Sequence, residues 1–221
     1  MKTKTPSMPE RECRFLSASV ELRKEGEDKK PMVRGYAAKF DSLSENMGSS
    51  EYEIREIIKP GAFDEVLGDD VRALFNHDSS AILARSKNGE GTLHMGVDSV
   101  GLWYEFEAPD TQVGRDLVTS IARGDVDQSS FSFTVRKDGQ DWEERQEGDG
   151  PTIATRTITK VARLYDVAPV TYPAYPDATV ALRSLEEFRK TEEPEEPDPI
   201  DQTISIRHWQ RRADSISKPA V

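Results

Sequence analysis

Alternating hydrophobic and polar positions run through much of the chain and predict short β-strands. Residues 15–22 alternate in this way, with Leu16, Ala18, Val20 and Leu22 on one side. A polar turn follows, and residues 33–40 form a second strand-like run, so we expect these two runs to pair as a hairpin. Further strands are expected at 53–59, 71–78, in several short pieces between 81 and 108, and at 129–136, 153–163 and 164–171.

Helical periodicity is confined to short segments. In the segment 111–125, Val113, Leu117, Val118 and Ile121 fall on one face of a helix, and Gly124 follows as a C-terminal stop. A Pro60-Gly61 turn is expected to lead into a short helical piece at 62–67. The Asp-, Glu- and Gly-rich segment before residue 153 is expected to form a mobile loop. Many strands with one or two helices predict a mainly β, α+β protein built as a barrel or sandwich.

Composition divides the chain into one folded domain with polar ends. Hydrophobic residues make up 35% of the chain, which is a low share for a uniformly compact protein, and charged residues make up 32%, which is a high share. We expect a flexible N-terminus at 1–12 and a folded domain at 13–184. An acidic, proline-rich extended linker and a basic tail should follow at 185–221.

Charge and motifs exclude several classes of protein. The net charge of −11 argues against a nucleic-acid-binding protein, since phosphate contacts need clustered cations. No apolar run is long enough to span a membrane, and the first residues lack the apolar core of a secretory signal, which favours an intracellular protein. Cys13 is the single cysteine and is interpreted as an incidental thiol. Phosphate-binding and zinc-binding motifs are absent, so we expect no cofactor and no metal.

Three histidines are candidates for a general base. His208 lies in the polar tail, and His94 lies within a strand pattern with no polar neighbours. His77 ends an apolar strand between Asn76 and Asp78, where a rigid element meets a loop, and such a place suits a positioned base.

Serines cluster in the sequence SSFSF, and strand parity narrows the choice of nucleophile. If Phe131 and Phe133 point into the core, Ser129 points with them. Ser130 and Ser132 then project from the other face, and parity does not choose between them. A serine on the solvated face of a strand is also an ordinary structural feature.

A hydroxyl nucleophile needs a base, and that base needs an orienting partner. Asp166 interrupts an apolar strand, and a buried carboxylate must be paired or hydrogen-bonded, so it is the candidate partner of the imidazole. Asp78 is the local competitor, but its adjacent position makes it a poorer orienter of His77. Arg85 and Arg115 are interpreted as surface salt-bridge residues.

Six segments occur in an order that resembles the caudovirus prohead protease family. They are RGYAAKFD, IIKPGAFDEVL, ALFNHD with LAR after it, GLWYEFEAPDT, SSFSF and LYDVAPVTYPAYPDA, and they cover about residues 14–184. The resemblance implies a herpesvirus-assemblin-like β barrel surrounded by a few helices, and serine endopeptidase activity.

The resemblance also implies the roles of three residues. The histidine of the NHD-type motif corresponds to His77 as general base, and the first serine of the S-F-x-F motif corresponds to Ser130 as nucleophile. Asp166 stands where the family usually has Glu and would orient the ring. Ser129 and Ser132 stand where many members have Met and Gly.

Members of this family cleave the scaffold, or the scaffolding segment of the major capsid protein, inside the immature shell, and often themselves. The resemblance therefore implies these partners and a place in the host cytoplasm, inside the procapsid, with self-association left open. The basic tail would direct the enzyme into the shell, be removed by self-cleavage, or have no role. Two other classes stay open: a non-catalytic head-assembly or scaffold protein that has kept the barrel, and a β-barrel module that binds a small ligand.

Overall fold

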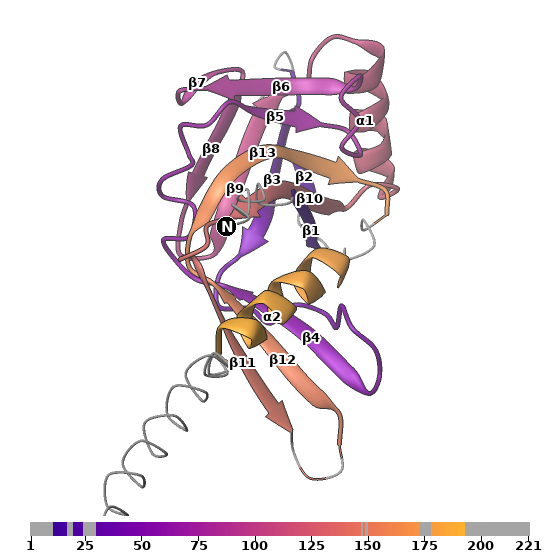
Figure 1. Ribbon diagram of the computed structural model, residues 1–221. Coiled ribbons are helices and arrows are strands. Elements are labelled where there is room, and N and C mark those ends of the chain that lie inside the picture. Colours follow the sequence, from indigo (N-terminus) through magenta and orange to yellow (C-terminus); the bar gives the residue numbers. More distant parts are fainter. Residues whose placement is uncertain are drawn as a thin grey trace, which may run out of the picture. The chain divides into compact units, whose positions relative to one another are not determined.

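The computed structural model describes residues 11–16, 20–23, 30–146, 148, 150–172 and 178–192. These residues form thirteen strands and two helices (Figure 1). The strands are arranged in three sheets of six, three and four strands. The mainly β, α+β class predicted from the sequence is thus confirmed.

The largest sheet contains the strands that carry the candidate site residues. Its strands lie in the order β1 (Glu12–Leu16), β10 (Gln128–Val135), β13 (Val161–Val170), β5 (Val71–Leu74), β6 (Ile82–Lys87) and β7 (Glu90–Gly91). The pairs are antiparallel except for β13 and β5, which run parallel. Strands far apart in the sequence are therefore neighbours here.

Two smaller sheets and two helices complete the described residues. The three-stranded sheet has the order β11 (Gln140–Gln146), β12 (Thr152–Ile158) and β4 (Tyr52–Ile58). The four-stranded sheet has the order β2 (Val20–Arg23), β3 (Met32–Lys39), β9 (Gly101–Glu107) and β8 (Leu93–Val97). The helices are α1 (Gln112–Arg123) and α2 (Ala178–Glu192).

The predicted N-terminal hairpin is present, but it is shorter than the pattern suggested. β2 pairs with β3 in an antiparallel register, as expected. β1 instead pairs with β10, more than a hundred residues along the chain, and so belongs to the six-stranded sheet. No pairing between described strands joins the three sheets, so they do not close into the expected hydrogen-bonded barrel.

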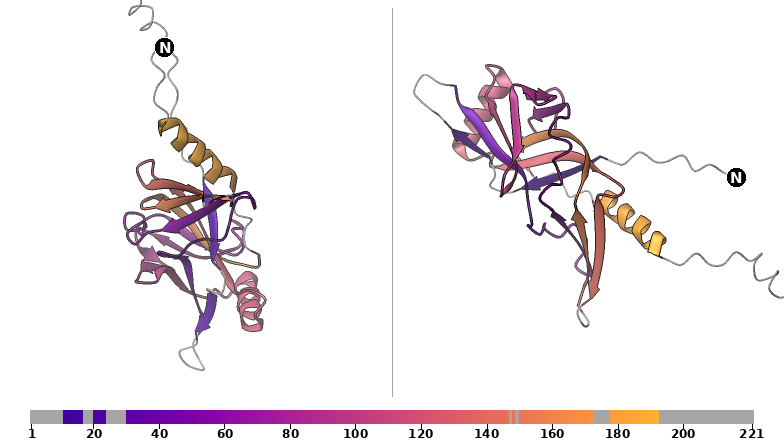
Figure 2. Two further views of the ribbon diagram at one scale, coloured as in Figure 1. Left: turned by 90° about the horizontal axis from the view of Figure 1, so that it is seen from below. Right: turned by 90° about the vertical axis from the view of Figure 1, so that its left-hand side faces the viewer.

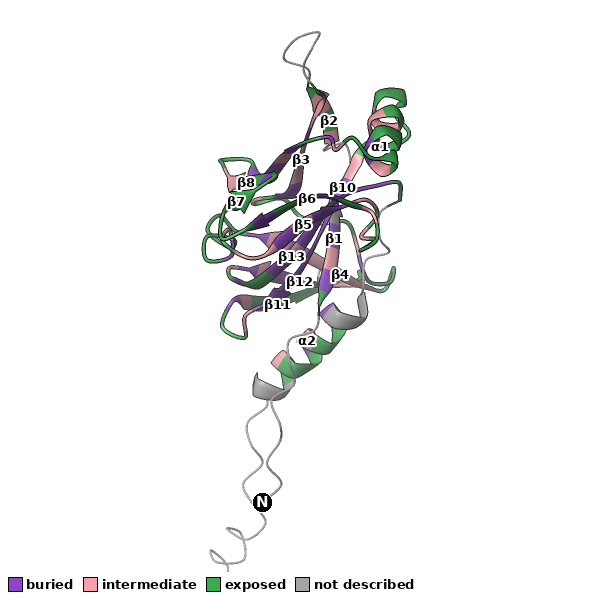
Figure 3. Ribbon diagram, turned by 90° about the horizontal axis from the view of Figure 1, so that it is seen from above, coloured by how far each residue is buried: buried purple, intermediate pink, exposed green. Residues whose placement is uncertain are grey.

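The main core lies against the inner face of β10. Phe131 and Phe133 are buried there with their ring centroids 4.7 Å apart, and Phe63 packs edge-on against Phe131 at 5.7 Å. Figure 3 shows buried residues along both β10 and β13. Ser129 points into this core and donates a hydrogen bond of 2.8 Å to the Tyr104 hydroxyl. The predicted parity of the SSFSF segment is therefore confirmed.

The helix predicted around residues 111–125 is present as α1. The Thr111 side chain caps its first turn by accepting a hydrogen bond from the Gly114 N–H at 3.2 Å. Leu117 is fully buried, and Gly124 ends the helix in the left-handed region at φ 79°. The local sequence signals were sufficient because capping and amphipathicity act within one segment.

Three local predictions were wrong. The polar segment before residue 153 is not a loop throughout, because residues 140–146 form β11, and β11 and β12 make a long hairpin (Figure 2). Residues 62–67 form successive turns instead of a helical piece, each closed by a hydrogen bond from an N–H to the carbonyl three residues earlier. The expected strands at 153–163 and 164–171 divide earlier, after Ile158, where the Thr159 and Lys160 N–H groups turn to the Gly139 carbonyl.

The C-terminal part differs from the extended linker expected from residue 185. The chain divides into two units at residues 183 and 184, and the second unit begins as helix, because α2 continues to Glu192. The first proline after α2 is Pro194, so no proline interrupts the helical segment. The remaining tail residues, including His208, and residues 1–10 lie outside the described part of the chain. None of the helices described is long and apolar enough to cross a bilayer.

Candidate active site

His77 lies in a tight turn directly after β5. Asn76 and His77 both have left-handed backbone angles, with φ 53° and 59°, which non-glycine residues adopt rarely and at an energetic cost. Asn76 fixes this turn to the end of β13, because its N–H donates to the Pro169 carbonyl and its side-chain oxygen accepts from the Thr171 N–H. The turn thereby directs the imidazole across β13 toward β10.

Ser130 lies on the outer face of β10, opposite the face that carries Phe131 and Phe133. In register it faces Ala168 of β13, while Ser132 faces Asp166. Ser130 and Ser132 are thus on the same face, as predicted, and both are fully buried.

Asp166 reaches this outer face because β13 contains a bulge. Ser132 pairs with Asp166, but the next residue, Phe133, pairs with Leu164, so Tyr165 is the extra residue. Strict alternation would place Asp166 and Leu164 on the same face. The bulge instead lets Leu164 enter the core while the Asp166 carboxylate faces the serines.

The structure brings the three residues together in one hydrogen-bonded series. The distance from His77 Nδ1 to Asp166 Oδ1 is 2.5 Å, and that from His77 Nε2 to Ser130 Oγ is 2.6 Å. A carboxylate only accepts hydrogen bonds, so Nδ1 carries the ring proton in this arrangement. Nε2 is then the acceptor that faces the Ser130 hydroxyl.

A backbone carbonyl of β1 also contacts the Ser130 hydroxyl. Ser130 Oγ lies 2.8 Å from the Arg14 carbonyl oxygen, so the single hydroxyl proton has two acceptors, Arg14 and His77. Ser130 has no exposed surface, whereas the His77 side chain is 17% exposed. The Ser130 hydroxyl is therefore closed to solvent in this conformation.

Arg11 also contacts the Asp166 carboxylate, and the sequence analysis missed it. Its guanidinium pairs with Asp166 Oδ2 and donates a hydrogen bond to Ser132 Oγ. The two carboxylate oxygens of Asp166 are therefore divided between Arg11 and His77. Arg11 lies in the segment assigned to a flexible N-terminus, and no local pattern marks it, because its contacts depend on the pairing of β1 with β10.

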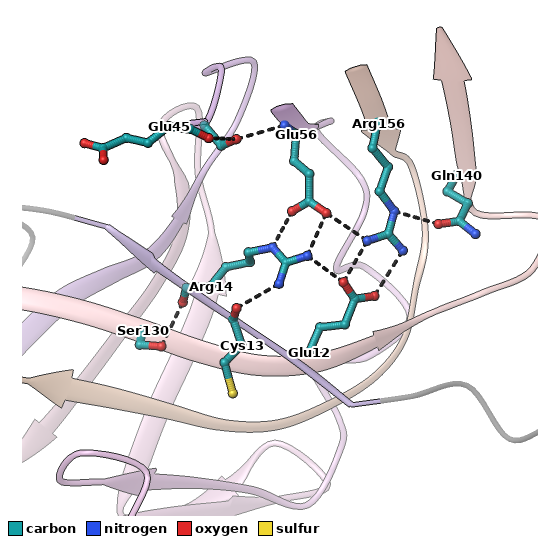
Figure 4. Close-up of polar contacts among 9 residues, drawn as sticks. Glu12, Cys13, Arg14, Glu45, Glu56, Ser130, Gln140 and Arg156 are labelled. Atoms are coloured by element: carbon teal, nitrogen blue, oxygen red, sulfur yellow. Dashed lines mark hydrogen bonds and ion pairs between the residues drawn. The ribbon is translucent and has the colours of Figure 1, made fainter. Parts of the chain in front are cut away.

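A buried network of charges fixes β1 next to Ser130 (Figure 4). Glu12 and Arg14 lie on the inner face of β1, and both are buried. Arg14 Nη2 donates to Glu56 of β4 at 2.7 Å and to Glu12 at 2.6 Å. Arg156 of β12 donates to Glu12 and Glu56 at 2.7 and 2.8 Å, and to Gln140 at 2.7 Å. Two arginines thus neutralise two glutamates between the six-stranded and three-stranded sheets.

The network predicts a loss of stability in acid. Burial alone would raise the pKa of Glu56, but the charges and hydrogen bonds of Arg14 and Arg156 outweigh burial and lower it to about 2. Because this pKa is depressed on folding, the stabilisation is present above the ordinary glutamate pKa and is lost as pH falls toward 2. We expect Glu56 to account for about 3 kcal/mol of that loss.

Urea denaturation at about pH 6 and about pH 3 measures the larger part of this loss, about 2 kcal/mol. Glu56→Gln should lower stability at the higher pH and flatten the acid dependence, since its side chain does not titrate. Glu65→Gln, at an exposed position, is the matched control and should keep the wild-type slope. An unchanged slope in Glu56→Gln would contradict the prediction.

The other candidates from the sequence lie apart from this series. Arg85 pairs with Asp70, and Arg115 pairs with Asp110, both at the surface as expected. Asp78 accepts hydrogen bonds from the Ser80 N–H and hydroxyl, which lower its pKa. His94 is exposed on β8 and lies opposite Glu105 in register, so the expectation that it has no polar neighbour was wrong.

Cys13 lies closer to the site than its position in the sequence indicates. It is opposite Ser132 in the pairing of β1 with β10, and burial raises the pKa of its thiol. A thiol with a raised pKa is a poorer nucleophile near neutral pH, which supports its interpretation as an incidental residue. Within the described residues, no group of His, Cys, Asp and Glu side chains is arranged to hold a metal ion.

The geometry defines a class of protein. A serine hydroxyl bonded to an imidazole, whose second nitrogen is bonded to a carboxylate, is the arrangement that serine hydrolases use for nucleophilic attack on a carbonyl. A family model described as "Caudovirus prohead serine protease" matches residues 18–192. The chain belongs to the caudovirus prohead serine protease family.

Comparisons with individual proteins contribute less to this assignment than the family model does. No curated protein matches the chain. A solved structure, that of the bacteriophage T4 capsid assembly protease gp21, is similar over 72% of this chain and 98% of the T4 chain. The identity is 10% and the TM-score 0.37. The family match is therefore what carries the assignment.

Proposed function

We propose that the protein is a serine endopeptidase in which Ser130 is the nucleophile, His77 the general base and Asp166 the group that orients the imidazole. The observation that carries this proposal is the continuous series from Ser130 Oγ through both ring nitrogens to Asp166. The three residues of this series come from segments that are distant in the sequence. The chain that holds them belongs to a family of serine proteases.

In the proposed reaction, Ser130 Oγ attacks the carbonyl carbon of a peptide bond while His77 Nε2 takes its proton. Asp166 holds the proton on Nδ1 and stabilises the imidazolium. His77 then gives the proton to the leaving amine, and an acyl-enzyme remains on Ser130. Water, deprotonated by His77, hydrolyses the ester, so the products are a carboxylate and an amine. Backbone N–H groups would stabilise the oxyanion.

The proposed substrates are the scaffold protein or the scaffolding segment of the major capsid protein, and the chain itself. The family assignment supports action in the prohead, within the assembling particle. Host cytoplasm is the proposed setting for that assembly.

A serine-reactive phosphonate tests the nucleophile directly. The wild-type protein should gain the mass of one phosphonate adduct on Ser130, because His77 activates that hydroxyl. Ser130→Ala should gain none, and His77→Ala should react far more slowly. Labelling of Ser132 instead, or equal labelling of denatured and native protein, would refute the assignment.

Co-expression with the cognate capsid and scaffold proteins tests the biological substrate. With the wild-type chain, intact-mass analysis should show shortened capsid or scaffold protein, and a shortened protease if it cleaves itself. With Ser130→Ala, all chains should keep their full masses. Normal processing with Ser130→Ala would instead favour a non-catalytic assembly protein.

A further inference from the structure

A face rich in arginine surrounds the proposed catalytic residues. Register places Arg72 of β5 beside Asp166, and Arg85 of β6 beside Arg72, so these side chains lie on the same outer face of the sheet as Ser132. The bulge at Tyr165 returns Arg163, which faces Thr134, to this outer face. We call Arg11, Arg72, Arg85 and Arg163 the arginine face.

The arginine face carries more positive than negative charge. Arg72 and Arg85 share one carboxylate, Asp70, and Arg11 shares Asp166 with His77. The hydrogen bonds of Arg85 and the charge of Arg72 lower the pKa of Asp70 to about 2, so it stays ionised. Four arginines thus face Asp70 and Asp166, and Asp69, which accepts a hydrogen bond from the Leu164 N–H, is a third carboxylate nearby. The face keeps an excess of positive charge, in a chain whose net charge is −11. Such a concentration of positive charge attracts anionic groups.

Arg163 is the member of the face best placed to bind a ligand. It is exposed, and it forms no ion pair with any residue that the structure describes. Its guanidinium lies 4.9 Å from the centre of the Tyr165 ring, and Arg11 lies at the same distance from that ring. The Tyr165 ring therefore contacts two guanidinium groups, and one of them, that of Arg11, already pairs with the proposed catalytic carboxylate of Asp166.

We propose that Arg163, with Arg11 and Tyr165, forms a subsite that binds acidic side chains of the substrate next to the bond to be cleaved. The proposal rests on the proposed function, since it assigns a substrate class to the same site. An arginine held against an aromatic ring keeps its planar donors free for a carboxylate, which suits recognition of Asp or Glu. Substrate segments rich in Asp or Glu should therefore be cleaved preferentially.

Binding can be measured without catalysis on the full-length Ser130→Ala protein. The probes are a fluorescein-labelled peptide rich in Glu and the same peptide with every Glu replaced by Gln, followed by fluorescence anisotropy. The Glu peptide should bind more tightly, and added salt should weaken its binding selectively. Arg163→Glu in this background should weaken Glu-peptide binding by about fivefold to tenfold, because an attraction becomes a repulsion.

Arg123→Glu is the matched control, since Arg123 is an exposed arginine at the end of α1, outside the arginine face. It makes the same change in net charge and should leave binding within about twofold. Equal binding of the Glu and Gln peptides would overturn the proposal. Equal effects of Arg163→Glu and Arg123→Glu would also overturn it, because they would indicate a response to net charge alone.

Cleavage of a mixed peptide library by the wild-type protein separates this proposal from the proposed function. Sites cleaved by the wild type should be enriched in Asp and Glu, and Arg163→Glu should lose that enrichment while it still cleaves. Cleavage without acidic enrichment would refute the subsite and leave the protease assignment intact. An absence of Ser130-dependent cleavage would refute the protease assignment, whereas the peptide-binding result would still decide the subsite.

Discussion

Replacement of Ser130 by alanine is expected to lower the rate of peptide-bond cleavage by about a millionfold, to the residual level that binding alone supports. The hydroxyl oxygen that we propose forms the acyl-enzyme is absent in this variant, and neither the His77 ring nor a water molecule in place of the hydroxyl supplies the same nucleophile. The rate should be measured in single-turnover conditions on the uncleaved form of the protein that the wild-type chain shortens on co-expression. The fold should persist, because the change removes one buried hydroxyl and costs about 1–2 kcal/mol.

Ser132→Ala is the matched control for this variant, because Ser132 is also buried on the outer face of β10. It loses a hydrogen bond from Arg11 and no contact with the imidazole. We expect activity within about tenfold of wild type, as for loss of one hydrogen bond. An active Ser130→Ala protein together with an inactive Ser132→Ala protein would transfer the nucleophile to Ser132.

Asp166→Asn is expected to lower kcat by about ten-thousandfold, and the reason lies in the contact with Arg11. Arg11 only donates hydrogen bonds, so the amide oxygen of an asparagine would turn toward it. The amide NH₂ group would then donate to His77 Nδ1 and force the ring proton onto Nε2. In that tautomer Nε2 no longer accepts the Ser130 proton. Steady-state kcat and KM measure the effect, and KM should change little.

Two further variants separate this explanation from a general loss of charge. Asp78→Asn changes the neighbouring acid, whose carboxylate binds Ser80, and should leave kcat near the wild-type value. Arg11→Ala combined with Asp166→Asn frees the amide to turn its oxygen toward His77, so part of the lost kcat should return. No recovery in the double variant would mean that Arg11 does not control the orientation.

Most strands and α1 could be predicted from the sequence because their signals are local. Alternation marks a strand when one face is buried, as in β3 and β4, and a cap with an apolar stripe marks α1. β11 was missed because Trp142 is its single buried residue, so the rest of its sequence is polar. The strand conformation of β11 depends on pairing with β12, and the sequence of β11 alone contains no signal of that pairing.

The candidate site was partly accessible from the sequence. His77 could be found from its place at the end of an apolar strand, and parity correctly placed Ser130 and Ser132 together. Parity could not choose between the two serines, because both project from the same face, and the geometry now favours the one at 2.6 Å from His77 Nε2. Arg11 and the Arg14 carbonyl could not be found, because their roles depend on long-range pairing of β1.

The bulge at Tyr165 makes the number of residues in β13 as important as their identity. Deletion of Tyr165 would make Leu164 and Asp166 adjacent, so simple alternation would keep their side chains on opposite faces. Leu164 would stay in the core and Asp166 would still face the serines, but the ring that Arg11 and Arg163 contact would be lost. Deletion of Val167, in the regular part of the strand, would instead put Asp166 and Ala168 on opposite faces. A shortened β13 should therefore be tolerated at residue 165 and not at residue 167, and a library built from substitutions alone would not reveal that difference.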